Sequence, residues 1–282
     1  MTQPAAESAP RAPRPQTIME VVRKKQINPH MVRLTFGGEG FKDFVDRPVT
    51  DKYIKLLFAD PAHGLTPPYD IDAIRRDLGP EAVPLRRTYT VRKVNKKAKT
   101  IDVDFVVHGE DGIAGPWAAG AQRGDVVCFN GPGGNYKPEE SIDWHLLAGD
   151  EAALPAIAAA LEAMPANAEG VAFIEVQDEN DEIELTKPEG VELRWIHRKS
   201  EFTPTSTKLA AEVMKYPWRS GLVQVFAHGE REVIKSLRRY LADDRGIDRR
   251  MMSLSAYWAY GRAEDTFQAE KKEPIGKIFP DA

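Results

Sequence analysis

Hydrophobic and polar residues alternate in short segments of the first half of the chain, over residues 17–134. In the segment 31–36, Val32, Leu34 and Phe36 fall on one side of an extended strand and the intervening residues on the other. The same pattern recurs at 52–58, 87–94, 100–107 and 125–132. Such alternation is typical of half-buried antiparallel strands, and this number of them predicts a small closed barrel.

Two segments depart from this alternation. Residues 61–84 are punctuated by Pro and Gly, which predicts an excursion over the barrel with one short helix at most. Residues 1–16 contain four prolines and no apolar run. We therefore expect a disordered arm there, with no signal peptide.

In the second half of the chain, helical and strand-like patterns take turns. Leu154, Ile157, Leu161 and Met164 are spaced along one face of a predicted helix. Apolar strand segments are predicted at 144–150, 171–176, 191–196, 221–227 and 251–258, and helices at 151–164, 208–216 and 230–246. Strands that alternate with helices predict a mainly parallel sheet covered on both faces. The chain is thus divided into an arm (1–16), a barrel domain (17–138) and a nucleotide-type α/β domain with a C-terminal extension (139–282).

Composition narrows the possible functions. The 282 residues carry a formal net charge of −4, which argues against nucleic-acid binding because no net positive field is present. No run of 18 apolar residues occurs, so we expect no membrane span. The single cysteine, Cys128, lies between apolar residues and is predicted to be buried and inert. A lone cysteine favours a reducing compartment, and we expect a cytoplasmic protein that is a monomer.

The strand at 84–93, PLRRTYTVRK, carries unusual side chains at its start. Arg86 and Arg87 stand side by side, followed closely by Tyr89 and Thr90. One interpretation is a solvated strand end with ordinary turn chemistry. The other is that a barrel strand presenting Arg-x-Tyr-Thr holds a dinucleotide cofactor at the seam between the two domains, a favoured place for ligands.

Five motifs, met in order along the chain, carry a resemblance to a known family. They are RTYT (87–90), DFVVHGEDG (104–112), GPWA (115–118), GDEAALPAI (149–157) and AYWAYG (256–261). Together they resemble the siderophore-interacting proteins, FAD-dependent ferric-siderophore reductases of the ferredoxin-reductase-like superfamily. The resemblance implies a Greek-key barrel that binds FAD and an α/β domain that binds NADPH or NADH.

The resemblance also assigns roles to residues of the barrel. Arg87 offers a planar fork of donors that matches a pyrophosphate. Tyr89 is implied to pack on the flavin or its ribityl chain, and Thr90 to reach the flavin N5 edge. The other cofactor-binding residues that it implies are Asp104, Phe105, Val106, His108, Gly112, Ala114, Gly115 and Trp117. Taken alone, His108 is better explained as a satisfied core histidine, and only its place in the motif favours the cofactor. Trp117 is equally consistent with a core side chain.

In the α/β domain the resemblance points to Asp150, Glu151 and Ala153 beside the nicotinamide. Asp150 and Glu151 would repel a phosphate at the following helix, and capping that helix is their alternative role. Arg198 and Lys199 follow a strand and are candidates for holding a 2′-phosphate, which favours NADPH. Their alternative is a solvated strand end.

The substrate and metal predictions rest on fewer residues. Lys55 matches a lysine common in the family, and Arg262 is the nearest substitute for an Arg pair that the family often has where this chain has Ala259 and Tyr260. Both are predicted to attract an anionic ferric siderophore, and a solvated charge is the alternative for each. The histidines are scattered and no second cysteine exists, so no protein-bound metal site is predicted.

Two further departures from the family pattern lie near the predicted cofactors. Gly112-Ile113-Ala114 stands where Gly-Pro-Ala is usual, and Ala152 stands where Thr is common. The function predicted from these residues is NAD(P)H-dependent, FAD-mediated reduction of ferric siderophores. A general flavin or ferric reductase and a non-catalytic siderophore-binding protein are the alternatives.

Overall fold

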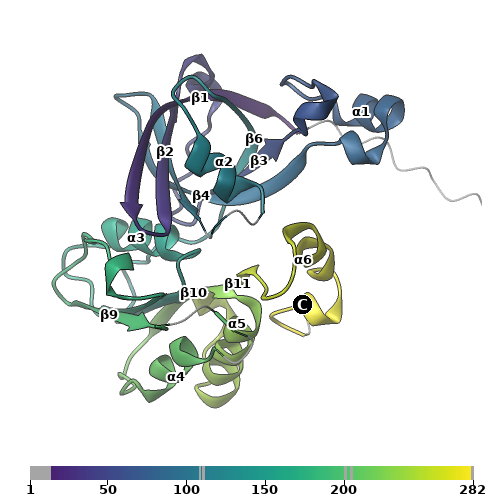
Figure 1. The fold of residues 1–282 in the computed structure, drawn as a ribbon. Coiled ribbons are helices and arrows are strands. Elements are labelled where there is room, and N and C mark those ends of the chain that lie inside the picture. The colour runs from purple at the N-terminus through teal and green to yellow at the C-terminus, as the bar shows by residue number, and fades with distance from the viewer. Residues whose placement is uncertain (1–13, 108, 110–111, 200–201, 204–205, 281–282) are drawn as a thin grey trace, which may run out of the picture.

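The computed structural model describes residues 14–107, 109, 112–199, 202–203 and 206–280. A barrel domain stands on an α/β domain, and helix α3 (Leu154–Ala163) lies between them (Figure 1). The predicted fold class, an antiparallel barrel followed by a parallel α/β domain, is confirmed. Within these residues, no helix has the length and apolar character needed to cross a bilayer.

The barrel closes through strands in the order β1-β2-β5-β4-β3-β6, and all neighbours are antiparallel. Because β2 pairs with β5 rather than with β3, the connections follow a Greek key. Val32, Leu34 and Phe36 point into the barrel core, as their alternation predicts. The strands are β1 (Gln16–Asn28), β2 (Met31–Gly37), β3 (Tyr53–Phe58), β4 (Leu85–Asn95), β5 (Thr100–Val106) and β6 (Val126–Gly133).

Strand β1 is the barrel strand that periodicity does not reveal. Its pairing with β2 shifts register between Val21 and Arg23, and again between Gln26 and Asn28. Each extra residue in a bulge reverses the side to which the following side chains point. The alternation is therefore broken inside the strand, although its backbone is extended throughout.

Two short helices accompany the barrel. Helix α1 (Ile71–Leu78) occupies the predicted excursion between two 3-10 turns, and Asp70 caps it by accepting a hydrogen bond from the amide of Ala73 at 2.9 Å. Helix α2 (Ala114–Gly120) forms where the glycines indicate a loop. Ala114 and Ala118 are buried in the barrel core, so close packing of small side chains outweighs the low helix propensity of the glycines.

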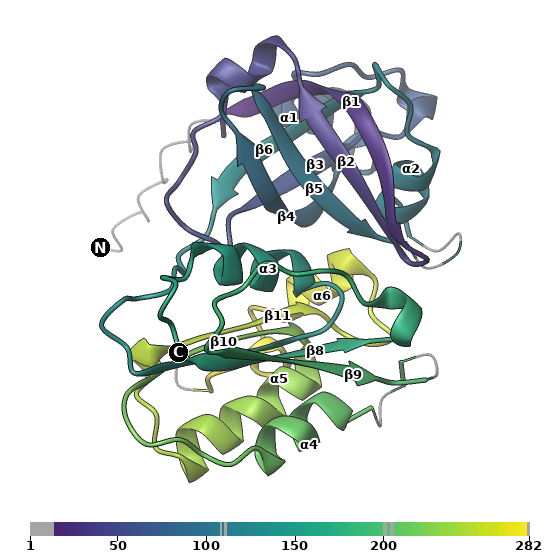
Figure 2. The ribbon, with the colours of Figure 1, turned by 90° about the vertical axis from the view of Figure 1, so that its left-hand side faces the viewer.

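The α/β domain contains a parallel five-stranded sheet in the order β11-β10-β7-β8-β9. Helix α3 covers the face toward the barrel, and α4 and α5 cover the opposite face (Figure 2). The strands are β7 (Trp144–Gly149), β8 (Gly170–Val176), β9 (Val191–His197), β10 (Val223–Glu230) and β11 (Met252–Trp258), and the helices on the far face are α4 (Lys208–Lys215) and α5 (Arg231–Arg238).

The C-terminal extension forms helix α6 (Glu264–Glu270) beside β11. Phe267 of this helix is buried against Ala256 and Ala259. Glu270, at the end of α6, forms ion pairs with both Arg231 and Arg262. The extension is thereby fixed to the start of α5, on the side of the sheet next to the barrel (Figure 1).

Helix α3 is buried on more faces than its hydrophobic pattern predicts. Leu154, Ile157 and Leu161 pack in one cluster with the sheet, as their spacing indicates. Ala156 and Ala160, on the other faces of the helix, are also fully buried. The cause is tertiary: the barrel covers the side of α3 that would face water in an isolated α/β domain.

One ion pair ties the barrel directly to α3. The guanidinium of Arg92, in β4, donates to the carboxylate of Glu162 at 3.1 Å, and the arginine is buried. Arg92 also holds the pKa of the Glu162 carboxyl below its usual range. The strand that carries the Arg-x-Tyr-Thr motif is therefore held by its far half against the α/β domain.

Burial of α3 predicts the effect of truncating its side chains. Leu161→Ala should lower the free energy of unfolding by about 2–5 kcal/mol, because Leu161 is 1 % exposed and its loss leaves a cavity. Leu78→Ala, also in a helix but 48 % exposed, should cost less than about 1 kcal/mol. Urea unfolding followed by circular dichroism measures both. Equal losses would show that the interdomain cluster is not tightly packed.

Candidate functional site

The Arg-x-Tyr-Thr motif begins strand β4 at the seam between the domains. The guanidinium of Arg87 donates to the carboxylate of Asp265, in α6, through two bonds of 3.2 and 3.1 Å. The arginine side chain is 14 % exposed, so it keeps access to solvent. Its fork of donors thus lies between the barrel and the C-terminal extension, and a diphosphate there would compete with Asp265.

Tyr89 and Thr90 point to opposite sides of β4. The ring of Tyr89 packs on Phe105 with centroids 4.4 Å apart, and burial raises the pKa of its phenol. Thr90 is buried, and its side chain lies next to the phenol of Tyr257, in β11. The motif therefore meets the barrel core through Tyr89 and the α/β domain through Thr90.

Two described glycines before α2 have a left-handed backbone conformation. Gly109 and Gly112 have φ angles of 58° and 80°, and a side chain at either would meet no atom within 4 Å. No side chain caps the N-terminus of α2, so its first amides keep their hydrogen-bonding capacity. A Cβ on Gly115 would lie 3.1 Å from the carbonyl oxygen of Val106, so this helix packs close to β5.

These features fit a flavin dinucleotide with its diphosphate near α2. Trp117, half-buried, packs edge-on against Phe58 with centroids 5.3 Å apart, and it closes this end of the barrel. Ala114 is buried as the first residue of α2. His108, another predicted cofactor residue, lies outside the described residues.

Three predicted cofactor residues have side chains that are engaged elsewhere. Asp104 is buried and accepts two hydrogen bonds from Arg33, at 2.5 and 2.7 Å, across β2 and β5. Phe105 is fully buried in the barrel core. Val106 faces the interdomain cluster around α3. For these residues, only the backbone at the end of β5 is left for contact with a cofactor.

Asp150 joins the ends of three strands at the carboxyl edge of the sheet. One of its carboxylate oxygens accepts from the Nε1 of Trp258 at 2.8 Å and from the amide of Glu230 at 2.9 Å. The other accepts from the amide of Ala152 at 3.0 Å. Burial, and then the charge of Glu151, raise the pKa of Asp150 to about 7. The bond to Ala152 closes the turn before α3, whose N-terminus itself has no side-chain cap.

Arg198 and Glu151 form a buried cluster with Glu175, which was not among the residues predicted from the sequence. The Arg198 guanidinium bridges Glu151 and Glu175, and all three residues are buried. Lys199 is exposed and adopts a positive φ of 61°. Ala153 is fully buried at the start of α3 and presents no surface to a nucleotide.

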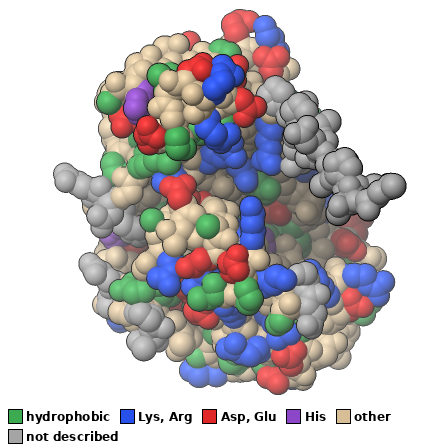
Figure 3. All heavy atoms as spheres, turned by 90° about the vertical axis from the view of Figure 1, so that its right-hand side faces the viewer, with side chains coloured by type: hydrophobic (Ala, Val, Ile, Leu, Met, Phe, Trp, Pro, Cys, Tyr) green, Lys and Arg blue, Asp and Glu red, His purple; other side chains and the backbone are tan. Residues whose placement is uncertain are grey.

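A pocket of about 400 Å³ lies where Lys55 faces the excursion and α6. It is lined by Lys55, Arg75, Arg86 and Thr88, and by Glu264 and Asp265 of α6. Burial, and then the charges of Arg14 and Arg86, lower the pKa of Lys55. Figure 3 shows Lys and Arg side chains gathered on the barrel side of the hollow between the domains.

Arg75 and Arg86 were missed as pocket residues, whereas Arg262 lies elsewhere. The position of Arg86 next to Arg87 was the one feature of the sequence that could have pointed to it. The pocket that both Arg75 and Arg86 line is formed only when the excursion and α6 pack against β3 and β4. Arg262 does not line this pocket, because its guanidinium donates to Glu270 at 2.7 Å.

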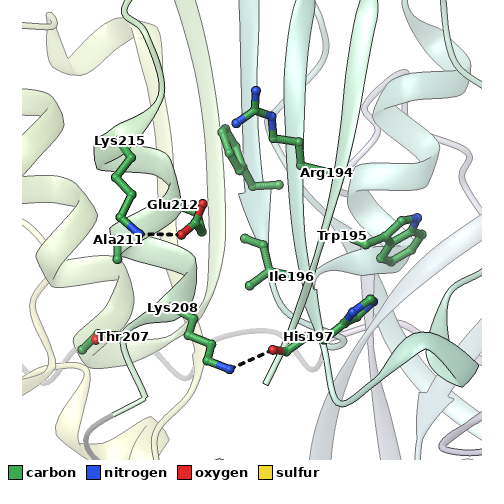
Figure 4. A pocket seen from close by; sticks show the side chains of 10 residues that line it. Arg194, Trp195, Ile196, His197, Thr207, Lys208, Ala211, Glu212 and Lys215 are labelled. Carbon is green, nitrogen blue, oxygen red and sulfur yellow. Dashed lines mark hydrogen bonds and ion pairs between the residues drawn. The ribbon is translucent and has the colours of Figure 1, made fainter. Parts of the chain in front are cut away.

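A second hollow, of about 600 Å³, lies between β9 and α4 on the sheet face turned away from the barrel (Figure 4). Its charged side chains are engaged with their neighbours. Lys208 donates to the carbonyl oxygen of His197 at 3.0 Å, and Lys215 pairs with Glu212 at 2.8 Å. Within the described part of the chain, no group of three His, Cys, Asp or Glu side chains is arranged to hold a metal ion.

The buried carboxyl of Asp150 predicts a dependence of stability on pH. A folded-state pKa of about 7 exceeds the unfolded value, so the free energy of unfolding should fall as pH rises from about 4 to about 7. Asp150→Asn should remove roughly 2–4 kcal/mol of this fall, whereas Asp244→Asn, at an exposed site, should leave it unchanged. Urea unfolding at a series of pH values measures the slopes. Parallel slopes for Asp150→Asn and the parent would contradict the assignment.

Comparison with known proteins identifies the family to which the chain belongs. Residues 20–136 match the model of the siderophore-interacting FAD-binding domain, and residues 142–261 match that of the siderophore-interacting protein. Ferric vibriobactin reductase ViuB of Vibrio cholerae is 33 % identical over 264 residues, 93 % of this chain and 96 % of the relative. The NADPH-dependent ferric-chelate reductase of Escherichia coli is 28 % identical over 245 residues, 85 % of this chain and 91 % of the relative.

A solved structure of a related protein has a similar fold. The crystal structure of a siderophore utilization protein from T. fusca superposes with a TM-score of 0.78 at 36 % identity, over 88 % of this chain and 94 % of that one. The family models together span most of the chain, and its barrel is the part that matches the FAD-binding model. This chain belongs to the siderophore-interacting protein family.

Proposed function

We propose that this protein is a cytoplasmic ferric-siderophore reductase that takes electrons from a nicotinamide dinucleotide through FAD. The observation that carries the proposal is the position of the Arg-x-Tyr-Thr motif. One end of β4 borders a basic pocket, and Thr90 contacts the α/β domain through Tyr257. A flavin held by this motif would lie between an electron donor and an anionic acceptor. The names of the two relatives, both reductases of ferric chelates, support the same reading.

The barrel supplies the groups that would hold FAD. Arg87 and the uncapped amides of α2 would bind its diphosphate, and Tyr89 would pack against the flavin. When bound, FAD accepts two electrons as a hydride and delivers them singly to Fe(III). The protein would contribute binding, orientation and charge.

The basic pocket supplies attraction for the substrate. Because the whole chain has a net charge of −4, an anionic ferric siderophore must be drawn by a local field. Lys55, Arg75 and Arg86 provide it at the seam. Arg262 pairs with Glu270 and does not line this pocket, so a role for it in binding the substrate is a prediction separate from the pocket.

The α/β domain supplies the place for the donor. The strand order reverses between β10 and β7, and the carboxyl ends of parallel strands at such a switch point bind nucleotides. Asp150 and Glu151 lie at this edge, next to Trp258. A monomer suffices for the proposed function, because one chain contains both domains and the seam.

The first test concerns the cofactor. Arg87→Ala should raise the Kd for FAD at least about tenfold, because a charge-assisted fork to the diphosphate is lost. Arg86→Ala, one residue away but facing the basic pocket, should change it less than about twofold. Quenching of flavin fluorescence on titration into apoprotein measures both. Equal Kd values for Arg87→Ala and the parent would remove Arg87 from the cofactor site.

The second test concerns the substrate pocket. Lys55→Ala and Arg86→Ala should each lower kcat/KM for a ferric tris-catecholate by about tenfold at low salt, and less as salt rises. A neutral ferric tris-hydroxamate should be affected little. Lys42→Ala, at an exposed site on the barrel, serves as the matched control.

The same variants distinguish an error in the substrate pocket from an error in the proposed electron transfer. Bleaching of the flavin by a nicotinamide dinucleotide under anaerobic conditions should match the parent in all of them. Unchanged turnover of the tris-catecholate in Lys55→Ala and Arg86→Ala would contradict the pocket. Bleaching without any reduction of iron would indicate a general flavin reductase, and no bleaching at all would indicate a binding protein.

A further inference from the structure

The carboxyl edge of the sheet determines where each end of a bound dinucleotide lies, given the proposed function. The nicotinamide must reach the seam, where Thr90 of the barrel meets Tyr257 of β11. From the switch point beside β10, the remainder then extends over the ends of β7, β8 and β9. Three strand spacings, about 14 Å, separate β10 from β9. The adenosine end of an extended dinucleotide therefore lies beside the residues that end β8 and follow β9.

Arg198 is the arginine at that position, and its donors are already engaged. Its Nη1 donates to Glu151 at 3.0 Å and to Glu175 at 3.2 Å, and its Nη2 donates to Glu151. Its Nε is buried with no hydrogen-bond partner among the described residues, and the whole residue is 8 % exposed. A phosphate would have to break a buried ion pair on both sides of the guanidinium in order to bind it.

The charge around Arg198 is also unfavourable to a phosphate. Asp150, Glu151 and Glu175 are all buried within one interacting cluster, against the single guanidinium of Arg198. Glu175 is further held in place because it accepts a hydrogen bond from the amide of Leu209, in α4, at 3.0 Å. A 2′-phosphate at this edge would meet carboxylates in excess of the one arginine.

Among the described residues, Lys199 and Lys208 lie close to Arg198 in the fold, and neither offsets this excess. Lys208 donates to the carbonyl oxygens of His197 and Arg198, both at 3.0 Å, and so bridges the end of β9 to α4. Lys199 is exposed, and an isolated exposed lysine contributes little to anion binding because water and salt screen its charge.

We infer that Glu151 and Glu175 are specificity-determining residues: by holding Arg198 between them, they select NADH over NADPH as the electron donor. This reverses the interpretation of Arg198 as a 2′-phosphate ligand. The arginine neutralises buried carboxylates instead, and a ribose with free hydroxyls suits an edge rich in carboxylates. Neither carboxylate touches the reacting atoms, so their effect is on binding.

The first experiment needs no variant. Calorimetric titration of the FAD-loaded protein with NAD⁺ and with NADP⁺ should give a Kd for NADP⁺ at least about tenfold higher. Equal Kd values, or tighter binding of NADP⁺, would overturn the selection while leaving the proposed function intact. Binding of neither nucleotide would overturn the nicotinamide donor of the proposed function, and the selection with it.

The second experiment releases the arginine. Glu151→Gln and Glu175→Gln each leave Arg198 with one carboxylate fewer. Each should lower the Kd for NADP⁺, so that the ratio of the Kd for NADP⁺ to the Kd for NAD⁺ falls at least threefold. Glu182→Gln, which removes a carboxylate paired with His197 outside this cluster, should keep the parent ratio. Thermal melting checks that each variant is folded. A ratio that stays at the parent value in both cluster variants would overturn the role of these carboxylates.

Discussion

The burial of helix α3 between the barrel and the sheet is the constraint on which the rest of the structure depends. The helix is apolar almost all round, and neither domain alone can cover it. Packing both domains on it fixes their relative position to within the tolerance of a close-packed core. Arg92 and Glu162 add a directed contact at the same place. A site assembled from β4, β11 and α6 therefore keeps its geometry without any covalent link between those elements.

Charged groups at the seam and along the carboxyl edge of the sheet are wholly or partly removed from water, and each must be compensated. Asp150 is held by three donors, Arg198 by two carboxylates and Arg87 by Asp265. Unpaired, such groups would cost several kcal/mol each on removal from water. Their pairing also determines which of them remain available to a ligand. Arg87 keeps solvent access whereas Arg198 does not, so two arginines that look alike in sequence differ in what they can offer a ligand.

Strand β4 contacts both domains at the candidate site. Alternation along β4 directs Tyr89 into the barrel and Thr90 toward β11. The same strand begins at the basic pocket, and its far half is anchored on α3. In the proposed function, cofactor, substrate and donor are thus arranged around a single rigid element, whose position the interdomain core holds.

The sequence by itself determined the fold class and most strands, because side chains that alternate or recur every 3.6 residues must bury one face. It also placed Arg87, Tyr89 and Thr90 on one barrel strand, since strand periodicity is local; their cofactor roles, which the family resemblance implies, stay predictions. It did not determine β1 with its bulges, helix α2, or the partners of Asp104, Arg198 and Arg262. Those depend on which distant residues are brought within hydrogen-bonding distance. Arg198 meets Glu151 and Glu175 only because β7, β8 and β9 are neighbours in the sheet, and strand order is a property of the tertiary structure.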